Sequence, residues 1–176
     1  DTLDYTGSGL HEGSKLIWAS AGEKRRELGR EIREPPSLPE GFGRILPVIP
    51  GIAVVRGPKH TLPRDTQDAA MESLAKVFAV WRRREAFPLL VVVDEPDFCA
   101  RNIDNFLWVA FTRSDPATDS YGPQALTRAK HWMCSPPLIL DARLKSFHAP
   151  PLEENPAIAA AAENLAAPGG PLHGFY

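Results

Sequence analysis

Apolar residues along the chain fall into short runs that proline, glycine and charged residues separate. The run Leu89–Val93 does not alternate with polar residues, which is typical of a strand buried on both faces in a parallel sheet. A β-branched run at 52–55, flanked by Pro-Gly and Gly-Pro pairs, predicts a second strand. Residues 138–140 predict a last short strand, and residues 15–19 predict a first one.

The segment between the strands at 52–55 and 89–93 predicts a helix. Its apolar positions trace one face of a 3.6-residue repeat and comprise Ala70, Leu74, Val77, Phe78 and Trp81. Asp65 or Thr66 is expected as the N-cap, and the arginines 82–84 are expected in the last turn, where cations interact favourably with the helix dipole. Strand, helix and strand together predict a βαβ unit.

Three further helices are predicted. Ile103, Phe106, Leu107 and Ala110 indicate a helix over 102–111, on the other face or the edge of the sheet. The charged segment 23–34 favours a short exposed helix that ends at two prolines, and an alanine-rich helix is expected over 156–167. The chain is thus predicted to be one α/β domain, residues 1–176, with a small, mostly parallel sheet and flanking helices, and 154–176 as a C-terminal helix and tail.

Composition narrows the class of protein. The 176 residues are 43% hydrophobic, which suits one globular domain, and a net charge of −2 makes a nucleic-acid partner unexpected. Two cysteines are too few for a disulfide framework or a structural zinc site. The longest apolar run is far shorter than a membrane span of roughly 20 residues. A cytoplasmic protein without a membrane partner is expected, and its 18 prolines predict long irregular connections.

Acidic residues directly after a buried strand are the most suggestive chemical signal. Asp94, Glu95 and Asp97 follow the strand at 89–93, as in the magnesium-binding half of a nucleotidase. No phosphate-binding G-x-x-x-x-G-K-[ST] motif accompanies them, so the favoured interpretation is that they cap the next helix. The five histidines are scattered, and Cys99 and Cys134 are interpreted as small apolar fillers, so no metal site is predicted.

Two clusters of opposite charges remain. Arg113 lies beside Asp115 and Asp119 in a loop that could recognise a carboxylate or phosphate, or could hold itself together by internal ion pairs. Asp141, followed by Arg143 and Lys145, presents the same alternatives. The structural interpretation is favoured for both.

Two segments together resemble a known family. Residues 89–122 and 136–153 are similar to the carboxy-terminal domain of the UbiD family of reversible (de)carboxylases, and the segment GSKLIWASAG resembles a strand of some larger members. In the first segment, acidic residues end a strand, a Trp-containing helix follows, and a Thr-Arg-x-x-Pro-x-x-Asp loop comes last. The second resembles a strand that ends in Asp-Ala. The matching positions are Asp94, Asp97, Asn105, Trp108, Thr112, Arg113, Asp115, Pro116, Asp119 and Asp141.

The resemblance implies what this chain lacks. Family members use prenylated FMN, held with a divalent metal and potassium on a central flavin-binding domain that also supplies a Glu-Arg-Glu set of catalytic residues. No part of this chain matches that domain. The expectation is therefore a C-terminal domain or small subunit of a carboxy-lyase acting on an aromatic or conjugated acid, inactive alone, without catalytic residues, metal or cofactor of its own.

The family's carboxy-terminal domain packs against its counterpart in another subunit and closes on the flavin domain. The resemblance therefore implies two partners, a larger flavin-binding chain or domain and a second copy of this chain. Five aromatic residues suit an interface, although ordinary core packing is the favoured interpretation of each: Trp81, Trp108, Phe111, Trp132 and Tyr121. The loop 131–138 is predicted to face the substrate, with a pocket wall of Met133, Ser135, Pro137 and Leu138. Two alternatives stay open: a non-catalytic adaptor that tethers a larger enzyme, and an ATPase-like domain with a metal at Asp94.

Overall fold

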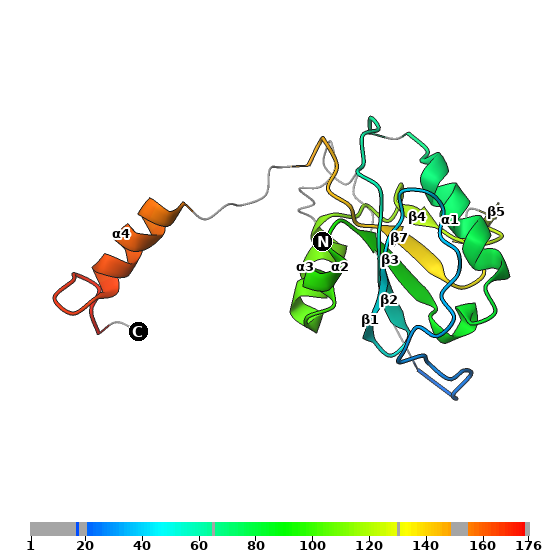
Figure 1. The fold of residues 1–176 in the computed structure, drawn as a ribbon, viewed down its shortest axis with the longest axis horizontal. Coiled ribbons are helices and arrows are strands. Elements are labelled where there is room, and N and C mark those ends of the chain that lie inside the picture. Colours follow the sequence, from blue (N-terminus) through cyan, green and yellow to red (C-terminus); the bar gives the residue numbers. More distant parts are fainter. Residues whose placement is uncertain (1–16, 18–20, 65, 130, 149–154, 175–176) are drawn as a thin grey trace.

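The computed structural model describes residues 17, 21–64, 66–129, 131–148 and 155–174 (Figure 1). Five strands form one sheet in the order β1-β2-β3-β7-β4, and β5 and β6 form a separate hairpin. The strands are β1 (Ile45–Ile49), β2 (Ile52–Arg56), β3 (Leu89–Val93), β4 (Ser120–Tyr121), β5 (Leu126–Arg128), β6 (His131–Met133) and β7 (Leu138–Asp141). The helices are α1 (Ala69–Val80), α2 (Pro96–Cys99), α3 (Ile103–Thr112) and α4 (Pro156–Ala166), with a 3-10 helix η1 (Arg84–Ala86).

The centre of the sheet is parallel and its edges are antiparallel. β3 lies between β2 and β7, with Val91 opposite Val54 on one side and Leu140 on the other. β1 and β4 pair antiparallel with β2 and β7. The predicted α/β class, with a mostly parallel central sheet and flanking helices, is confirmed. The strand predicted at 15–19 lies outside the described residues, apart from Ile17, which is in no strand.

Helices cover both faces of this sheet (Figure 1). Leu90 and Val92 of β3 join the core beneath α1, which includes Leu74 and Phe78, whereas Val91 packs into a second core beneath α2 and α3. Every residue of β3 is buried. The nonalternating run LLVVV is explained by this position, because a strand between two helical layers has no solvent-facing side.

Both predicted ends of the α1 helix were wrong. Asp68 is the N-cap, and its Oδ1 accepts the backbone N–H of Ala70 at 2.8 Å. The helix ends at Val80, so the arginines 82–84 lie beyond it. Trp81 already has an extended backbone, and its indole Nε1 donates to the backbone oxygen of Glu34 at 2.9 Å. The extended backbone at Trp81 turns the chain away from the helix axis before the arginines can join the last turn.

The charged segment 23–34 contains no helix, contrary to the prediction. Gly29 donates from its backbone N–H to Ala86 at 2.7 Å and accepts from Gly51 at 2.9 Å. A Cβ at Gly29 would lie 2.3 Å from the Phe87 ring, so only glycine allows this approach. Contacts with distant residues therefore replace the local hydrogen bonds of a helix.

Strand β1 was missed, because the proline-rich segment before Pro50 was interpreted as a connection. Pro47 lies within β1, which is tolerated because β1 is at the edge of the sheet. Pro50 and Gly51 form the turn to β2, where Gly51 has φ +83°, a conformation that favours glycine. The short strands β4, β5 and β6 were also missed.

The two remaining helix predictions are confirmed. Asn102 caps α3, since its side-chain oxygen accepts from the backbone N–H of Asn105 at 2.8 Å. Asn155 caps α4 in the same way and Pro156 occupies its first turn. Figure 1 shows α4 standing away from the sheet and the other helices, and none of its residues is buried. Within the described ranges, no helix has the length and apolar character needed to cross a membrane.

Candidate functional site

A group of buried charged side chains lies at and beyond the end of β7. We call it the charge cluster, and it consists of Asp68, Asp119, Asp141, Arg143 and Lys145. Asp141 is the last residue of β7, and Asp68 caps α1. Ligands of open α/β sheets bind outside the carboxyl ends of the parallel strands, which makes this region the first place to look for a functional site.

Arg143 is the centre of the cluster. Its side chain is only 1% exposed. The guanidinium donates to both carboxylate oxygens of Asp141, from Nε at 2.8 Å and from NH2 at 2.6 Å. The same NH2 donates to Asp68 at 2.6 Å, and NH1 donates to the backbone oxygen of Pro58 at 2.9 Å. A planar guanidinium matches two carboxylates in this way better than an ammonium could.

Lys145 forms the second half of the cluster. Its Nζ lies 3.1 Å from Asp119 Oδ2 and donates to the backbone oxygens of Arg113 at 3.0 Å and Asp141 at 3.1 Å. An ammonium has three N–H donors, and these three acceptors use all of them. Lys145 therefore holds the end of β7 to the end of α3 and has no donor left for a ligand in this arrangement.

Two of the buried aspartates, Asp141 and Asp119, have pKa values that are shifted in opposite directions. Burial alone would raise the pKa of Asp141, but the hydrogen bonds from Arg143 and the charge of Lys145 outweigh burial and lower it. Burial also raises the pKa of Asp119, and there the charge of Lys145 does not compensate. Asp141 is thus held firmly as a carboxylate, and Asp119 is the more readily protonated of the two.

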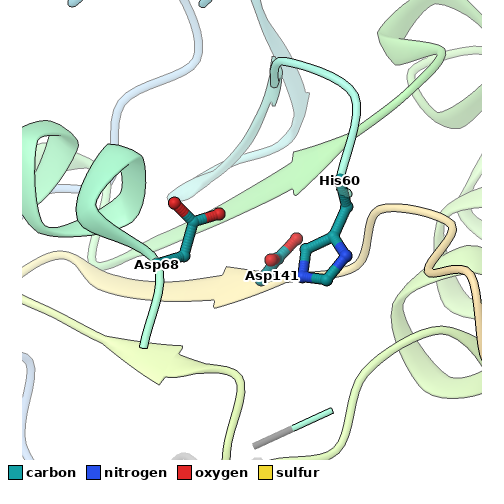
Figure 2. Close-up of side chains that lie close together, drawn as sticks. All are labelled: His60, Asp68 and Asp141. Atoms are coloured by element: carbon teal, nitrogen blue, oxygen red, sulfur yellow. The ribbon is translucent and has the colours of Figure 1, made fainter. Parts of the chain in front are cut away.

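His60, in the segment after β2, lies against this cluster (Figure 2). One ligand atom from each of His60, Asp68 and Asp141 lies within 4.8 Å of the others, a spacing that a metal ion could use. Arg143 already donates to both carboxylates and supplies the positive charge that a metal would bring. The donor set therefore does not fit a metal ion.

The His60 ring itself is buried, and burial lowers its pKa. Its Nδ1 atom has no hydrogen-bond partner. A neutral imidazole is the form expected in such a site, because an additional positive charge beside Arg143 and Lys145 would be unfavourable.

A cavity of about 760 Å³ opens beside the cluster. His60, Asp119 and Lys145 contribute to its polar part, and Tyr121, Trp132 and Phe147 contribute aromatic surface. Burial raises the pKa of Tyr121 to about 12, so its hydroxyl stays protonated at neutral pH. The arrangement suits binding or packing rather than proton transfer, because the charged groups of the cluster are paired with one another.

Part of the family-like motif is connected to this cluster. Arg113 NH1 lies 3.2 Å from Asp94 Oδ2, which also accepts the backbone N–H of Leu144 at 2.8 Å. Asp119 accepts the backbone N–H of Asp115 at 2.6 Å, and Pro116 accepts the hydroxyl of Ser120 at 2.7 Å. These bonds agree with the interpretation of the 112–119 loop as an internal network of ion pairs and turns.

The other motif residues lie elsewhere. Asp97 forms an exposed ion pair with Arg44 at 3.0 Å, and Thr112 donates to the backbone oxygen of Trp108 at 2.6 Å. The Asn105 side chain donates to the backbone oxygen of Phe98 at 3.0 Å. None of the three acidic residues after β3 caps a helix through its side chain as predicted: Glu95 occupies the N-cap position of α2 without such a bond, and Asp94 binds Arg113 instead.

The cysteines agree with their interpretation as apolar fillers. Cys99 ends α2 and is buried, which raises its pKa to about 11. Burial also raises the pKa of Cys134. Both thiols therefore stay protonated at neutral pH, and neither is activated as a nucleophile.

The predicted pocket wall lies away from the charge cluster. Met133 ends β6 and is exposed, and the Ser135 hydroxyl donates to Gln124 at 2.7 Å. Pro137 is buried after a cis peptide bond, and Leu138 begins β7, at the opposite end of that strand from Asp141. Among the described residues that line the large cavity, none of these four is included. Their role as a substrate wall stays a prediction.

Sequence reasoning did not select His60 or Asp68. The spacing of Asp141, Arg143 and Lys145 could have predicted that these three side chains lie together, because every second residue of an extended chain points to the same side. Asp68 lies 75 residues from Arg143 in the sequence, and no local pattern connects the two.

Comparison with known proteins gives a coherent but limited set of relatives. No family model matches the chain, and no solved structure matches it. The chain is 34% identical to an uncharacterized protein of Chlamydia trachomatis over 94% of this chain and 26% of that protein. It is 35% identical to an uncharacterized protein of Chlamydia muridarum over 82% of this chain and 23% of that protein.

One relative has a functional name. The chain is 28% identical to a Chlamydia pneumoniae protein that is named as a subunit of 4-hydroxybenzoate decarboxylase, over 89% of this chain and 25% of that protein. The chain thus spans about a quarter of the length of the curated relatives that it matches. It is similar, over most of its length, to one part of a protein named as a decarboxylase subunit.

Proposed function

We propose that this chain is the carboxy-terminal domain or small subunit of a UbiD-like carboxy-lyase that decarboxylates or carboxylates an aromatic or conjugated acid. The observation that carries the proposal is the similarity, over 89% of the chain, to a protein named as a subunit of 4-hydroxybenzoate decarboxylase. The resemblance of the segment between Asp94 and Asp141 to the UbiD family supports the same proposal.

In this proposal the domain contributes assembly and closure of the substrate cleft, and the reacting groups lie outside it. The charge cluster supports this division, because Arg143 and Lys145 are bound to groups of the protein itself. Prenylated FMN, with its divalent metal and potassium, would be held by the larger flavin-binding chain or domain. The donor set at His60, Asp68 and Asp141 does not suit a metal ion, which agrees with that division.

The test compares this chain with a complete protein of the relatives' length that contains it. We expect the complete protein to retain flavin and to release CO2 from 4-hydroxybenzoate or a related acid, and this chain alone to be colourless and inactive. A flavin-retaining preparation of this chain alone would contradict the proposed division of roles. If the complete protein keeps both its flavin and its turnover after residues 1–176 are deleted, the proposal as a whole is contradicted.

Variants of the predicted pocket wall distinguish the proposed role from the adaptor alternative. Met133→Trp and Leu138→Trp, made in the complete protein, should change the relative kcat/KM for different aromatic acids if the 131–138 loop faces substrate. If only the assembly state changes, the adaptor interpretation is favoured. Ile49→Trp, at the end of edge strand β1, is the matched control for Met133→Trp, because Ile49 is about as exposed as Met133.

A further inference from the structure

The large cavity beside the charge cluster is formed by three parts of the chain. Helix α1 contributes Lys76 and Ala79, and the β5–β6 hairpin contributes Trp132. Asp119 and Tyr121, at the start of β4, form the third part of the wall. Its volume of about 760 Å³ lies within the roughly 300–1,000 Å³ of small-molecule sites. The cavity is therefore of the size that a small ligand needs.

The hairpin side of this wall offers apolar surface. All six residues of β5 and β6 are exposed, and the two strands pair with each other and not with the main sheet. Trp132 is 42% exposed although it lines the cavity, and Leu126 and Phe147 are also exposed there. A ligand that covers these side chains would gain free energy from the burial of apolar area.

The charges around the cavity balance one another. Three carboxylates line it, on Glu72, Asp119 and Asp141. Two ammonium groups, those of Lys76 and Lys145, line it as well, and the guanidinium that binds Asp141 supplies a third positive charge. A charged ligand would meet no excess of the opposite charge, and desolvating its charge would be costly. The lining therefore favours a neutral ligand.

The polar part of the wall has hydrogen-bonding capacity that the chain does not use. Asp119 Oδ2 lies 3.1 Å from Lys145 Nζ and also accepts the backbone N–H of Asp115 at 2.6 Å. Among the described residues, Asp119 Oδ1 has no partner, and neither has Nδ1 of His60, which belongs to the same wall. Buried polar groups are normally satisfied, so a ligand with hydroxyl donors suits this part of the cavity.

We propose that this cavity binds a neutral polyhydroxylated ring, such as a mono- or disaccharide, with one ring face against Trp132 and a hydroxyl that donates to Asp119 Oδ1. The C–H groups of such a ring are apolar and pack on the face of an aromatic side chain. Each ligand hydroxyl both donates and accepts, which suits the hydroxyl groups of Thr66 and Thr127 in the same lining. This inference does not depend on the proposed enzymatic role.

The first test is a binding panel with the chain 1–176. The neutral probes are glucose, galactose, ribose and maltose, and glucuronate and glucosamine are the charged counterparts of glucose. We expect calorimetric titration to give a Kd below about 1 mM for at least one neutral sugar and weaker binding of the charged sugars. Failure of every neutral sugar to reach that affinity would overturn the inference. Tighter binding of a charged sugar than of every neutral one would overturn it as well.

Variants then locate the bound sugar. Trp132→Ala should weaken binding about fivefold or more through loss of the aromatic face. Trp108→Ala is the matched control, because Trp108 is exposed on α3 and is not in the cavity lining. Equal affinities of the native and Trp132→Ala chains, or an equal loss in Trp108→Ala, would place the sugar elsewhere and overturn the inference.

Asp119→Asn tests the hydroxyl contact. The amide keeps the shape of the carboxylate but accepts through one oxygen only, so the affinity for the sugar should fall by a similar factor. Asp119 is also bound to Lys145, so circular dichroism of this variant must first show the native fold. Unchanged affinity in a folded Asp119→Asn chain would contradict the proposed contact. If this variant does not fold, the comparison of Trp132→Ala with Trp108→Ala decides.

Discussion

The charge cluster and the solvent-facing side of α3, which carries Trp108 and Phe111, lie on the same domain and are opposite in kind. In the cluster, charged side chains are buried and each is matched by protein partners, as Arg143 is by Asp68 and Asp141. On that side of α3, large apolar side chains such as Trp108 are left in contact with solvent. The charges of the first region are thus matched within the chain, whereas the second region leaves apolar area exposed.

The largest effect is expected from removing the centre of the cluster. Arg143→Met leaves two buried carboxylates without their cation, and breaking a buried ion pair in this way costs about 3–5 kcal/mol. The free energy of unfolding from urea denaturation measures the loss. Arg128→Met, at an exposed position of β5, is the control and should change little. A loss below about 1 kcal/mol for Arg143→Met would show that the cluster does not stabilise the fold.

A pair of variants in α3 compares its two sides directly. Phe106→Ala removes a fully buried ring and should cost about 3–5 kcal/mol of unfolding free energy. Trp108→Ala, two residues later and exposed, should cost less than about 1 kcal/mol. Similar losses for the two variants would mean that Trp108 is covered when the chain is folded.

The pH dependence tests the histidines beside the cluster. Burial and the charges of Lys145 and Arg113 lower the pKa of His148 to about 4, and its Nδ1 accepts the backbone N–H of Lys145 at 3.2 Å. The unfolded chain takes up this proton near pH 6.5, so stability is present above that pH and falls as the pH drops toward 4. We expect about 1–2 kcal/mol of loss between pH 7 and pH 5 from His148.

His148→Gln should reduce this loss, and the lowered pKa of His60 should account for a remaining part. His131→Gln, at an exposed position of β6, is the control. Denaturation midpoints at pH 7 and pH 5 for the native chain and both variants make the comparison. An equal loss in native and His148→Gln chains would assign the pH dependence elsewhere.

The smallest effect is expected at the exposed ion pair of Arg44 and Asp97. Both side chains are largely exposed, and such pairs contribute less than about 1 kcal/mol, which salt screens further. A double-mutant cycle of Arg44→Gln and Asp97→Asn should give a coupling energy near the lower end of that range. A coupling energy as large as the effect of Arg143→Met would show that this exposed ion pair stabilises the fold as much as the buried charges do.

The sequence predicted the elements whose pattern is set by burial. β3, with no polar position, and α3, with Phe106 and Ala110 on one side, were both found because the sheet and helix periodicities are local. The segment 23–34 was predicted wrongly because the bonds of Gly29 to Ala86 and Gly51 come from distant parts of the chain. β1 was missed because Pro47 is unfavourable in a strand except at a sheet edge, and edge position is a tertiary property.

The site was less accessible to sequence reasoning than the fold. The aspartates of the family-like motif, such as Asp119 and Asp141, were identified, and the structure places them on either side of Lys145. Asp68, which shares Arg143 with Asp141, and the neighbour His60 come from the segment between β2 and α1, which carries no motif. Only the tertiary fold brings that segment to the end of β7.

Asp68 links two elements that would otherwise be independent. One carboxylate oxygen accepts the Ala70 amide at the start of α1, and the other accepts from Arg143 beyond the end of β7. Helix ends usually fray through local openings that leave the rest of the protein intact. Here, opening the first turn of α1 would also break the bond between Asp68 and the buried guanidinium of Arg143. The start of α1 and the end of β7 should therefore behave as one cooperative unit, and the first amides of α1 should exchange with solvent only as slowly as those of the central strands.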